Sequence, residues 1–234
     1  MDQMSSLGRQ TFMRGLPQWF LFAGLVAVSL VPQGVAQLVN ATPLFISLED
    51  VPSLGDANAR IAIVEFADYQ CPYCVAYANN MLPQIISDYV KTGKVRYFFK
   101  DLPIEILHPD AFKAAEAARC AGEQDKYWEM HNRLFKSVQA LGVNEMPGHA
   151  RMLGLDVPDF KQCLDSGRYA SQIRKDIQDS KKYGVQGTPT FFIGPLDTPQ
   201  ARMKPFKKIE GTQLYVAFQQ ALDPLLSPAG EEKY

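Results

Sequence analysis

The sequence has little excess charge of either sign, and it contains no low-complexity tract and no internal repeat. Its 234 residues carry 24 Lys and Arg against 25 Asp and Glu, which gives a net charge of −1 at pH 7. Binding to nucleic acid or to an anionic surface through electrostatics requires a basic excess, so we expect no nucleic-acid partner. With 47% hydrophobic and 21% charged residues, the composition is that of a globular domain with a sizeable core.

Histidine and cysteine are too few and too scattered for a structural zinc site. The chain has 3 His and 4 Cys. A zinc site takes about four ligands, usually as two close pairs separated by roughly 12 to 20 residues. Cys71 and Cys74 form one close pair, but Cys120 follows 46 residues after Cys74 and Cys163 a further 43 residues on. We therefore expect no bound metal.

The N-terminal residues differ from the rest of the chain. Arg9 and Arg14 precede an apolar run of 13 residues, 19–31, and small residues occupy positions 34 and 36. This order is typical of a secretory signal, and the run is shorter than the roughly 20 residues that span a bilayer. We predict that residues 1–36 are a signal peptide, with an uncleaved anchor through residues 19–31 as the alternative. Either one places the chain in the periplasm or another extracytoplasmic compartment.

The pattern after the signal begins with a strand, a helix and a strand. A brief strand is expected at 44–48, ended by Pro52 and Gly55. Residues 61–66 are nearly all apolar, as in a central strand that is buried on both faces. A helix is predicted from Pro72 to about Val90, kinked by Pro83 and ended by Gly93, and the next strand covers 95–100. This order predicts a parallel βαβ unit.

The second half of the chain is first helical and then returns to strands. Between His108 and about Lys182 the sequence predicts only helices. Strands are expected at 187–194 and 206–211, followed by a last helix that Thr212 caps and Pro224 closes. The fold class is therefore α/β, with a helical insertion between a βαβ half and a ββα half. The predicted parts are a leader at 37–58, a core at 59–104 and 184–226, the insertion at 105–183 and a tail at 227–234.

The pair Cys71–Cys74 is best explained as a redox pair. A purely structural disulfide across so small a loop would stabilise the fold little. Pro72 is suited to the first position of a helix, so the sulfur of Cys71 is expected to lie beside unpaired backbone N–H groups that favour the thiolate. The thiolate is the nucleophile in disulfide exchange. Cys74, one turn further along, is placed to resolve a mixed disulfide at Cys71.

Four stretches of the sequence resemble a known family. They are EFADYQCPYC (65–74), AARCAGEQDKYWEMHNRLF (117–135), FKQCLDSG (160–167) and GTPTFFIG (187–194). Together they resemble the DsbA-like branch of the thioredoxin-fold thiol–disulfide oxidoreductases, and the resemblance runs from about Val51 to Leu222. It implies a thioredoxin-like core with a helical insertion, which agrees with the element order read from the sequence.

The resemblance also implies a role for each residue of the site. Cys71 would be the exposed nucleophile and Cys74 the resolving thiol. Pro189 would be the cis-proline beside the disulfide, and the backbone of Thr188 would pair with an extended substrate segment by strand addition. Glu65 would be a buried acid with a raised pKa that moves a proton for Cys74. The alternative for Glu65 is a strand-end residue that faces solvent.

Two departures from the best-known oxidase of this family leave the direction of electron flow open. Tyr73 stands where that oxidase has a His whose positive charge stabilises the thiolate, so we expect a less extreme thiolate here. Thr188 stands where that oxidase has Val. Some members of the family join cysteines of the insertion into a second disulfide, and an oxidising compartment favours such a bond between Cys120 and Cys163. Two buried free thiols are the alternative.

The resulting hypothesis is an extracytoplasmic oxidoreductase that introduces disulfides into exported proteins through the pair Cys71–Cys74. Its substrates would be reduced or unfolded exported proteins, and a quinone-linked membrane protein of the DsbB or VKOR type would reoxidise it. No cofactor beyond the cysteine pair is expected. The leader is too short to be a dimerisation domain, so a monomer is expected. The alternatives are an isomerase or reductase with the same site, and a redox-inactive binding or chaperone module with structural disulfides.

Overall fold

Strand β3 (Ile61–Ala67) is the centre of the sheet, as its apolar sequence predicts. All seven of its residues are buried in the computed structural model, which describes residues 44–227. It runs parallel to β4 (Val95–Asp101) and antiparallel to β5 (Thr190–Asp197). The predicted βαβ unit is therefore present. Four short strands extend the sheet: β1 (Ile46–Ser47), β2 (Ser53–Leu54), β6 (Arg202–Met203) and β7 (Lys207–Glu210), in the order β1-β6-β5-β3-β4-β2 with β7 also paired to β5.

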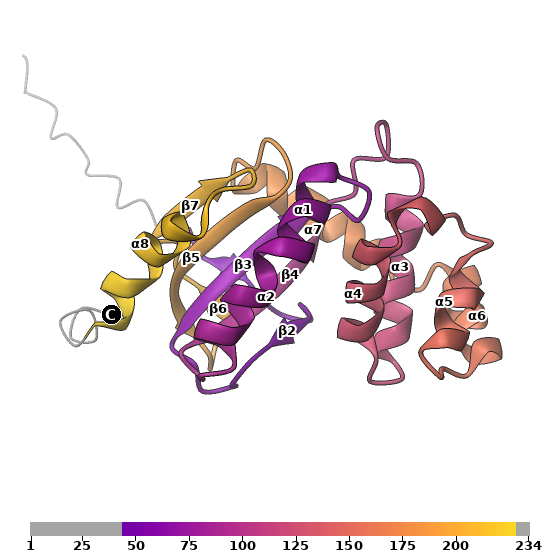
Figure 1. The fold of residues 1–234 in the computed structure, drawn as a ribbon, viewed down its shortest axis with the longest axis horizontal. Coiled ribbons are helices and arrows are strands. Elements are labelled where there is room, and N and C mark those ends of the chain that lie inside the picture. The colour runs from indigo at the N-terminus through magenta and orange to yellow at the C-terminus, as the bar shows by residue number, and fades with distance from the viewer. Residues whose placement is uncertain (1–43, 228–234) are drawn as a thin grey trace, which may run out of the picture. The chain divides into compact units, whose positions relative to one another are not determined.

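The helices between β4 and β5 form the predicted helical block, and in Figure 1 α3, α4, α5 and α6 stand together beside the sheet. They are α3 (Ala111–Gly122), α4 (Tyr127–Lys136), a short 3-10 turn (Val138–Ala140), α5 (Met146–Met152), α6 (Val157–Ser166) and α7 (Ala170–Lys182). Phe135 and Tyr127 of α4 are buried, and Trp128 is partly buried against the same core, so these aromatic residues serve packing.

Side chains of β3 alternate between the two faces of the sheet, and this alternation decides where its acid points. Ile61 and Ile63 pack in a cluster with α1 (Pro72–Asn80) and α8 (Tyr215–Leu226). Val64 and Phe66 pack on the opposite face with Tyr183, which follows α7. Glu65 shares the face of Ile61 and Ile63, so it is directed towards the helix that follows Cys71.

The helix after Cys71 is interrupted rather than only kinked. Helix α1 ends at Asn80, α2 (Leu82–Ile85) follows, and a π-helical turn at Ile86–Val90 completes the segment. Pro83 has no N–H to donate to the carbonyl four residues earlier, which explains the break. Gly93 has a φ of 76°, a left-handed conformation that suits glycine, and it ends the segment as predicted.

Several expectations about local structure were wrong. The expected strand at 44–48 is present as β1, but the short strand β2 between Pro52 and Gly55, which pairs with β4, was not predicted. Thr212 does not cap α8: the helix begins at Tyr215, and the Thr212 hydroxyl donates instead to the Tyr73 carbonyl at 2.9 Å. Pro224 does not close α8, which continues to Leu226 because Leu225 is buried in the core.

Some predictions concern residues outside the described range. The signal or anchor at 1–36, the start of the leader and nearly all of the tail at 227–234 fall there. Among residues 44–227, no helix is long and apolar enough to cross a membrane.

Candidate active site

Cys71 lies at the junction of β3 and α1, at the N-terminus of the helix. It is the N-cap residue, with extended backbone angles (φ −65°, ψ 122°), and Pro72 occupies the first helical turn. No side chain caps this helix. The backbone N–H groups of the first turn therefore remain available to the Cys71 sulfur, as the sequence predicted.

The surroundings of Cys71 favour its thiolate and lower its pKa to about 5. The largest contribution is a hydrogen bond from the Cys74 thiol; burial opposes it, and Thr188 and the backbone N–H groups of Tyr73 and Cys74 add to it. Cys-x-x-Cys thiols at helix starts have pKa values from about 3.5 to 7.5, so this value lies inside the range. An uncharged residue at position 73 is thus compatible with a stable thiolate.

Cys71 is buried, whereas the sequence predicted an exposed nucleophile. Only 5% of its surface is accessible, whereas the neighbouring Tyr73 is 66% exposed. The reason is the loop before β5, which folds over the sulfur: Cys71 Sγ lies 3.4 Å from the Thr188 carbonyl oxygen, to which only its thiol form donates. A substrate sulfur must therefore approach along this loop.

Cys74 is fully buried one turn into α1, and its pKa is raised well above the ordinary value. Burial is the main cause, followed by the hydrogen bond to Cys71 and the negative charges of Cys71 and Glu65. Both cysteines are unbonded in this structure. The pair thus divides into a thiolate at Cys71 and a thiol at Cys74, as a nucleophile and a resolving group require.

Glu65 is 1% exposed, so the solvent-facing alternative does not hold. The hydroxyl of Tyr97 on β4 donates to its Oε2, and its Oε1 has no hydrogen-bond partner among the described residues. Burial raises the pKa of Glu65 to about 8, against the stabilising Tyr97 hydrogen bond and with a smaller contribution from the Cys71 charge. The carboxyl group also lies within electrostatic range of Cys74. Its role in moving a proton for Cys74 stays a prediction.

Thr188 and Pro189 lie on the other side of the cysteine pair. The Thr188–Pro189 peptide bond is cis. The Pro189 carbonyl accepts from the Gly211 N–H at 2.8 Å, and the adjacent Thr212 hydroxyl reaches Tyr73. These bonds hold the loop before β5 and the loop after β7 against the start of α1. The pairing of the Thr188 backbone with a substrate strand stays a prediction.

Comparisons with known proteins agree with this geometry. The family model described as Thioredoxin matches residues 47–204. "Probable disulfide bond formation protein D" of Bacillus anthracis is 30% identical over 156 residues, which cover 63% of this chain and 71% of that protein. The crystal structure of α-DsbA1 from Wolbachia pipientis superposes with a TM-score of 0.70 at 25% identity, over 81% of this chain and 97% of that one.

The chain belongs to the DsbA-like branch of the thioredoxin family. The predicted fold, a thioredoxin-like core with a helical insertion, is confirmed by these matches. A further relative, "Na(+)/H(+) antiporter NhaA 3" of Salinispora tropica, is 37% identical over 139 residues, or 59% of this chain. The matched region is 21% of that protein, so the chain spans only about a fifth of the length of this antiporter relative.

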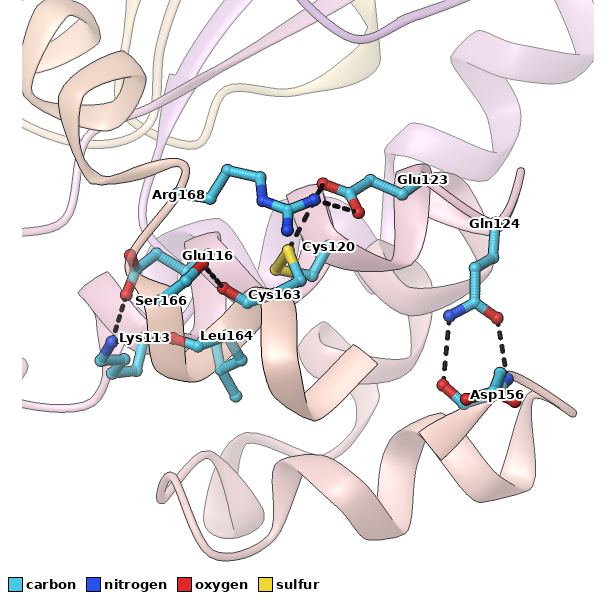
Figure 2. Close-up of a disulfide and its surroundings, with 10 residues drawn as sticks. All are labelled: Lys113, Glu116, Cys120, Glu123, Gln124, Asp156, Cys163, Leu164, Ser166 and Arg168. Carbon is cyan, nitrogen blue, oxygen red and sulfur yellow. Dashed lines mark hydrogen bonds and ion pairs between the residues drawn. A yellow bond between two sulfur atoms is a disulfide. The ribbon is translucent and has the colours of Figure 1, made fainter. Parts of the chain in front are cut away.

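The insertion of this DsbA-like chain contains the second cysteine pair (Figure 2). Cys120 of α3 and Cys163 of α6 form a disulfide, with an S–S distance of 2.03 Å. Arg168 places one guanidinium nitrogen 2.8 Å from both carboxylate oxygens of Glu123, next to the sulfurs. The disulfide and this ion pair tie α6 to the end of α3.

Sequence reasoning missed Asp68, which positions the loop before Cys71. Its buried carboxylate accepts from the backbone N–H groups of Gln70 (2.7 Å), Cys71 (3.2 Å) and Ile104 (2.7 Å), and it lies 2.8 Å from Nδ1 of His108. The available signal was an Asp at the start of a turn, where its side chain bonds the backbone two residues on. Asp68 thus fixes the position of Cys71 relative to the loop after β4.

Two further buried polar groups were also missed. His131 is fully buried among aromatic rings, bonded through Nδ1 to the Tyr69 hydroxyl at 3.1 Å, and burial lowers its pKa to about 3. Arg119 of α3 bridges Asp101 of β4 and Asp176 of α7 at 2.7 and 2.8 Å. Arg119, Asp101 and Asp176 lie in segments whose sequence predicts only a helix or a strand. The sequence pattern therefore does not predict that they pair.

The described residues place no metal site at the cysteine pair, and a well-formed hollow lies elsewhere. Among residues 44–227, no group of three or more His, Cys, Asp or Glu side chains is placed to hold a metal ion. A hollow of about 900 Å³ is lined by residues such as Ile61, Tyr89 and Pro195, at the start of β3. It lies at the end of the strand opposite to Cys71, and the site chemistry does not involve it.

Proposed function

We propose that this chain is an extracytoplasmic thiol–disulfide oxidoreductase that introduces disulfides into exported proteins. The observation that carries the proposal is the division of the pair: Cys71 favours the thiolate, Cys74 stays a buried thiol, and the Thr188 carbonyl lies beside Cys71. The similarity to a relative named for disulfide bond formation supports the same reaction class.

In the oxidised state, a substrate thiolate attacks Cys71 Sγ and breaks the Cys71–Cys74 bond. Cys74 leaves and ends as a thiol, and the substrate is joined to Cys71 as a mixed disulfide. A second substrate thiolate then attacks the substrate sulfur and expels the Cys71 thiolate. The substrate loses two electrons and the cysteine pair gains them. Because the environment stabilises the departing Cys71 thiolate, this last step is favoured.

The lowered pKa of Cys71 supports oxidation over reduction as the direction of electron flow. Stabilising the thiolate stabilises the reduced protein and makes its disulfide a stronger oxidant. Tyr73 contributes no positive charge, so this effect arises from the helix start, Cys74 and Thr188. The formation of disulfides in newly exported chains requires a protein disulfide that oxidises substrate thiols near neutral pH.

The remaining parts of the proposal follow from this direction. The substrates are reduced or unfolded exported proteins, and an extended segment of such a chain pairs with the backbone at Thr188. A quinone-linked membrane protein of the DsbB or VKOR type accepts the electrons. The cysteine pair acts without a further cofactor, and the protein acts as a monomer.

The test uses a reduced, unfolded protein with two cysteines as the substrate. The Cys74→Ala variant, offered the same protein in its oxidised form, is expected to accumulate a mixed disulfide, because its Cys71 thiolate opens the substrate disulfide and no Cys74 resolves the product. Cys71→Ser is expected to oxidise the reduced form only at the background rate. A reduction potential near that of thioredoxin, about −270 mV, would favour a reductase instead. Absence of any mixed disulfide with Cys74→Ala would show a binding or chaperone module whose disulfides are structural.

A further inference from the structure

The two carboxyl oxygens of Glu65 differ in their hydrogen bonding. Oε2 accepts a hydrogen bond from the Tyr97 hydroxyl, and Oε1 has no partner among the described residues. In the parallel pairing of β3 and β4, Glu65 lies opposite Phe99, so Tyr97 is its diagonal neighbour on the same face of the sheet. Tyr97 is itself fully buried, and the bond is therefore shielded from water.

An unpaired buried carboxyl oxygen costs free energy, and such a group is usually retained where it has a use. Cys74 supplies one. Its sulfur is fully buried, so bulk water cannot deliver or remove its proton directly. Glu65 lies within electrostatic range of Cys74, on the face of the sheet that α1 covers.

We propose that Tyr97 is a positioning residue of the cysteine site: it holds Oε2 of Glu65 and thereby leaves Oε1 to exchange a proton with Cys74. The proposal rests on the proposed function. When a substrate thiolate breaks the Cys71–Cys74 bond, the Cys74 thiolate takes the proton from Oε1, and Glu65 becomes a carboxylate that the Tyr97 hydroxyl stabilises. In the reverse step the carboxylate removes the proton from Cys74, which then attacks the mixed disulfide at Cys71.

Tyr77 provides a matched control for Tyr97. It lies one turn after Cys74 on α1, it is fully buried, and its ring packs on Phe191 and Phe218 at centroid distances of 4.5 and 5.7 Å. Its hydroxyl meets no partner at full hydrogen-bond geometry among the described residues, but it lies close to the Tyr97 hydroxyl and within electrostatic range of Glu65. Tyr77→Phe therefore removes an equally buried hydroxyl from the same core without removing a bond to Glu65.

The experiment follows the reaction of the reduced full chain with Ellman's reagent in a stopped-flow instrument. Cys71 releases the first thionitrobenzoate when it attacks the reagent, and Cys74 releases the second when it displaces the half bound to Cys71. We expect the second phase to accelerate with pH through an inflection near 8, the pKa of Glu65. Tyr97→Phe raises this inflection, and an increase of one pH unit slows the second phase roughly tenfold at pH 7.

The outcomes separate the possible explanations. The first phase should be unchanged in both variants, and Tyr77→Phe should slow the second phase clearly less than Tyr97→Phe, because it removes no bond to Glu65. In a Glu65→Gln background, which removes the inflection, Tyr97→Phe should have no further effect. Equal slowing by Tyr77→Phe, or further slowing in the Glu65→Gln background, would overturn the role of Tyr97. Absence of the second release from the unmodified protein would instead overturn the proposed function, and this role with it.

Discussion

The two cysteine pairs of this protein share one hydrophobic cluster, yet they differ in whether free backbone N–H groups lie beside the sulfur. Cys120 and Cys163 are bonded to each other within the bodies of α3 and α6. Cys71 and Cys74 are unbonded, and Cys71 precedes the first turn of α1. Backbone N–H groups inside a helix are engaged in helical hydrogen bonds, whereas those of a first turn are available to a neighbouring thiolate. Burial alone therefore does not make a thiol inert or reactive.

The separation of the paired residues along the chain also distinguishes the two pairs. Cys120 and Cys163 are 43 residues apart, so their bond closes a long loop. Cys71 and Cys74 are three positions apart, so their bond restricts the unfolded chain much less. We therefore expect the first pair to serve stability and the second to serve chemistry, and each of the following changes tests one side of this contrast.

The largest expected effect is on stability. Replacing both Cys120 and Cys163 with Ala should lower the free energy of unfolding by about 4 kcal/mol, because the unfolded chain gains the entropy of an open 43-residue loop. Denaturant unfolding of the purified protein measures the change. Oxidation of a reduced test protein, assayed where the variant is folded, should continue at the normal rate.

The matched control is the Cys71→Ala/Cys74→Ala variant, which should lose oxidation and keep most of its stability. If the Cys120→Ala/Cys163→Ala variant instead unfolded at the same denaturant concentration as the unmodified chain, the second disulfide would have no structural role. Loss of oxidation in a folded Cys120→Ala/Cys163→Ala variant would show that the two pairs are coupled.

The next effect concerns the active pair and depends on pH. The pKa of Cys71 falls from 9.0 in its ordinary state to about 5 in the fold. A depressed pKa stabilises the reduced protein fully above pH 9, and this contribution is lost as the pH falls through 5. At pH 7, about two pH units above the folded pKa, it amounts to about 2 kcal/mol after allowance for solvent near the sulfur.

Urea unfolding of the Cys120→Ala/Cys163→Ala variant at pH 5 and at pH 7 measures this contribution, because only the active pair then responds to reductant. The stability of the reduced form relative to the oxidised form should increase between the two pH values. Cys71→Ser, which has neither the thiolate nor the Cys71–Cys74 bond, should unfold identically under reducing and oxidising conditions at both pH values. A reduced form whose relative stability does not change with pH would contradict the assigned thiolate.

The contrast between the pairs was largely visible in the sequence, because it depends on local features. Pro72 directly after Cys71 marks a helix start, and an apolar strand before it fixes the βαβ unit. Local patterns do not report what distant segments bring to the site. Tyr97 on β4 and Asp68 with its contact to Ile104 depend on strand register and on loop packing, which no spacing in the sequence reveals.

The errors have the same origin. The expected exposure of Cys71 was wrong because the loop at Thr188, 117 residues further along, covers the sulfur. Thr212 has the residue type and the position of a helix cap, but a tertiary bond to Tyr73 takes its hydroxyl. Capping propensity describes an isolated helix end, and here a contact between distant segments overrides it.

The smallest expected effect concerns Tyr73, the exposed residue that lies between Cys71 and Cys74. Tyr73→His introduces a charge beside the thiolate, and it should lower the pKa of Cys71 by up to about 1 unit, because an opposite charge favours the ionised form. The shift is limited because position 73 is 66% exposed and water screens the charge. Titration of thiolate absorbance in the ultraviolet measures it, with Tyr73→Phe as the uncharged control. Equal pKa values in the His and Phe variants would show that the helix start, Cys74 and Thr188 alone set the thiolate, and that charge at position 73 has no part in distinguishing the reactive pair from the structural one.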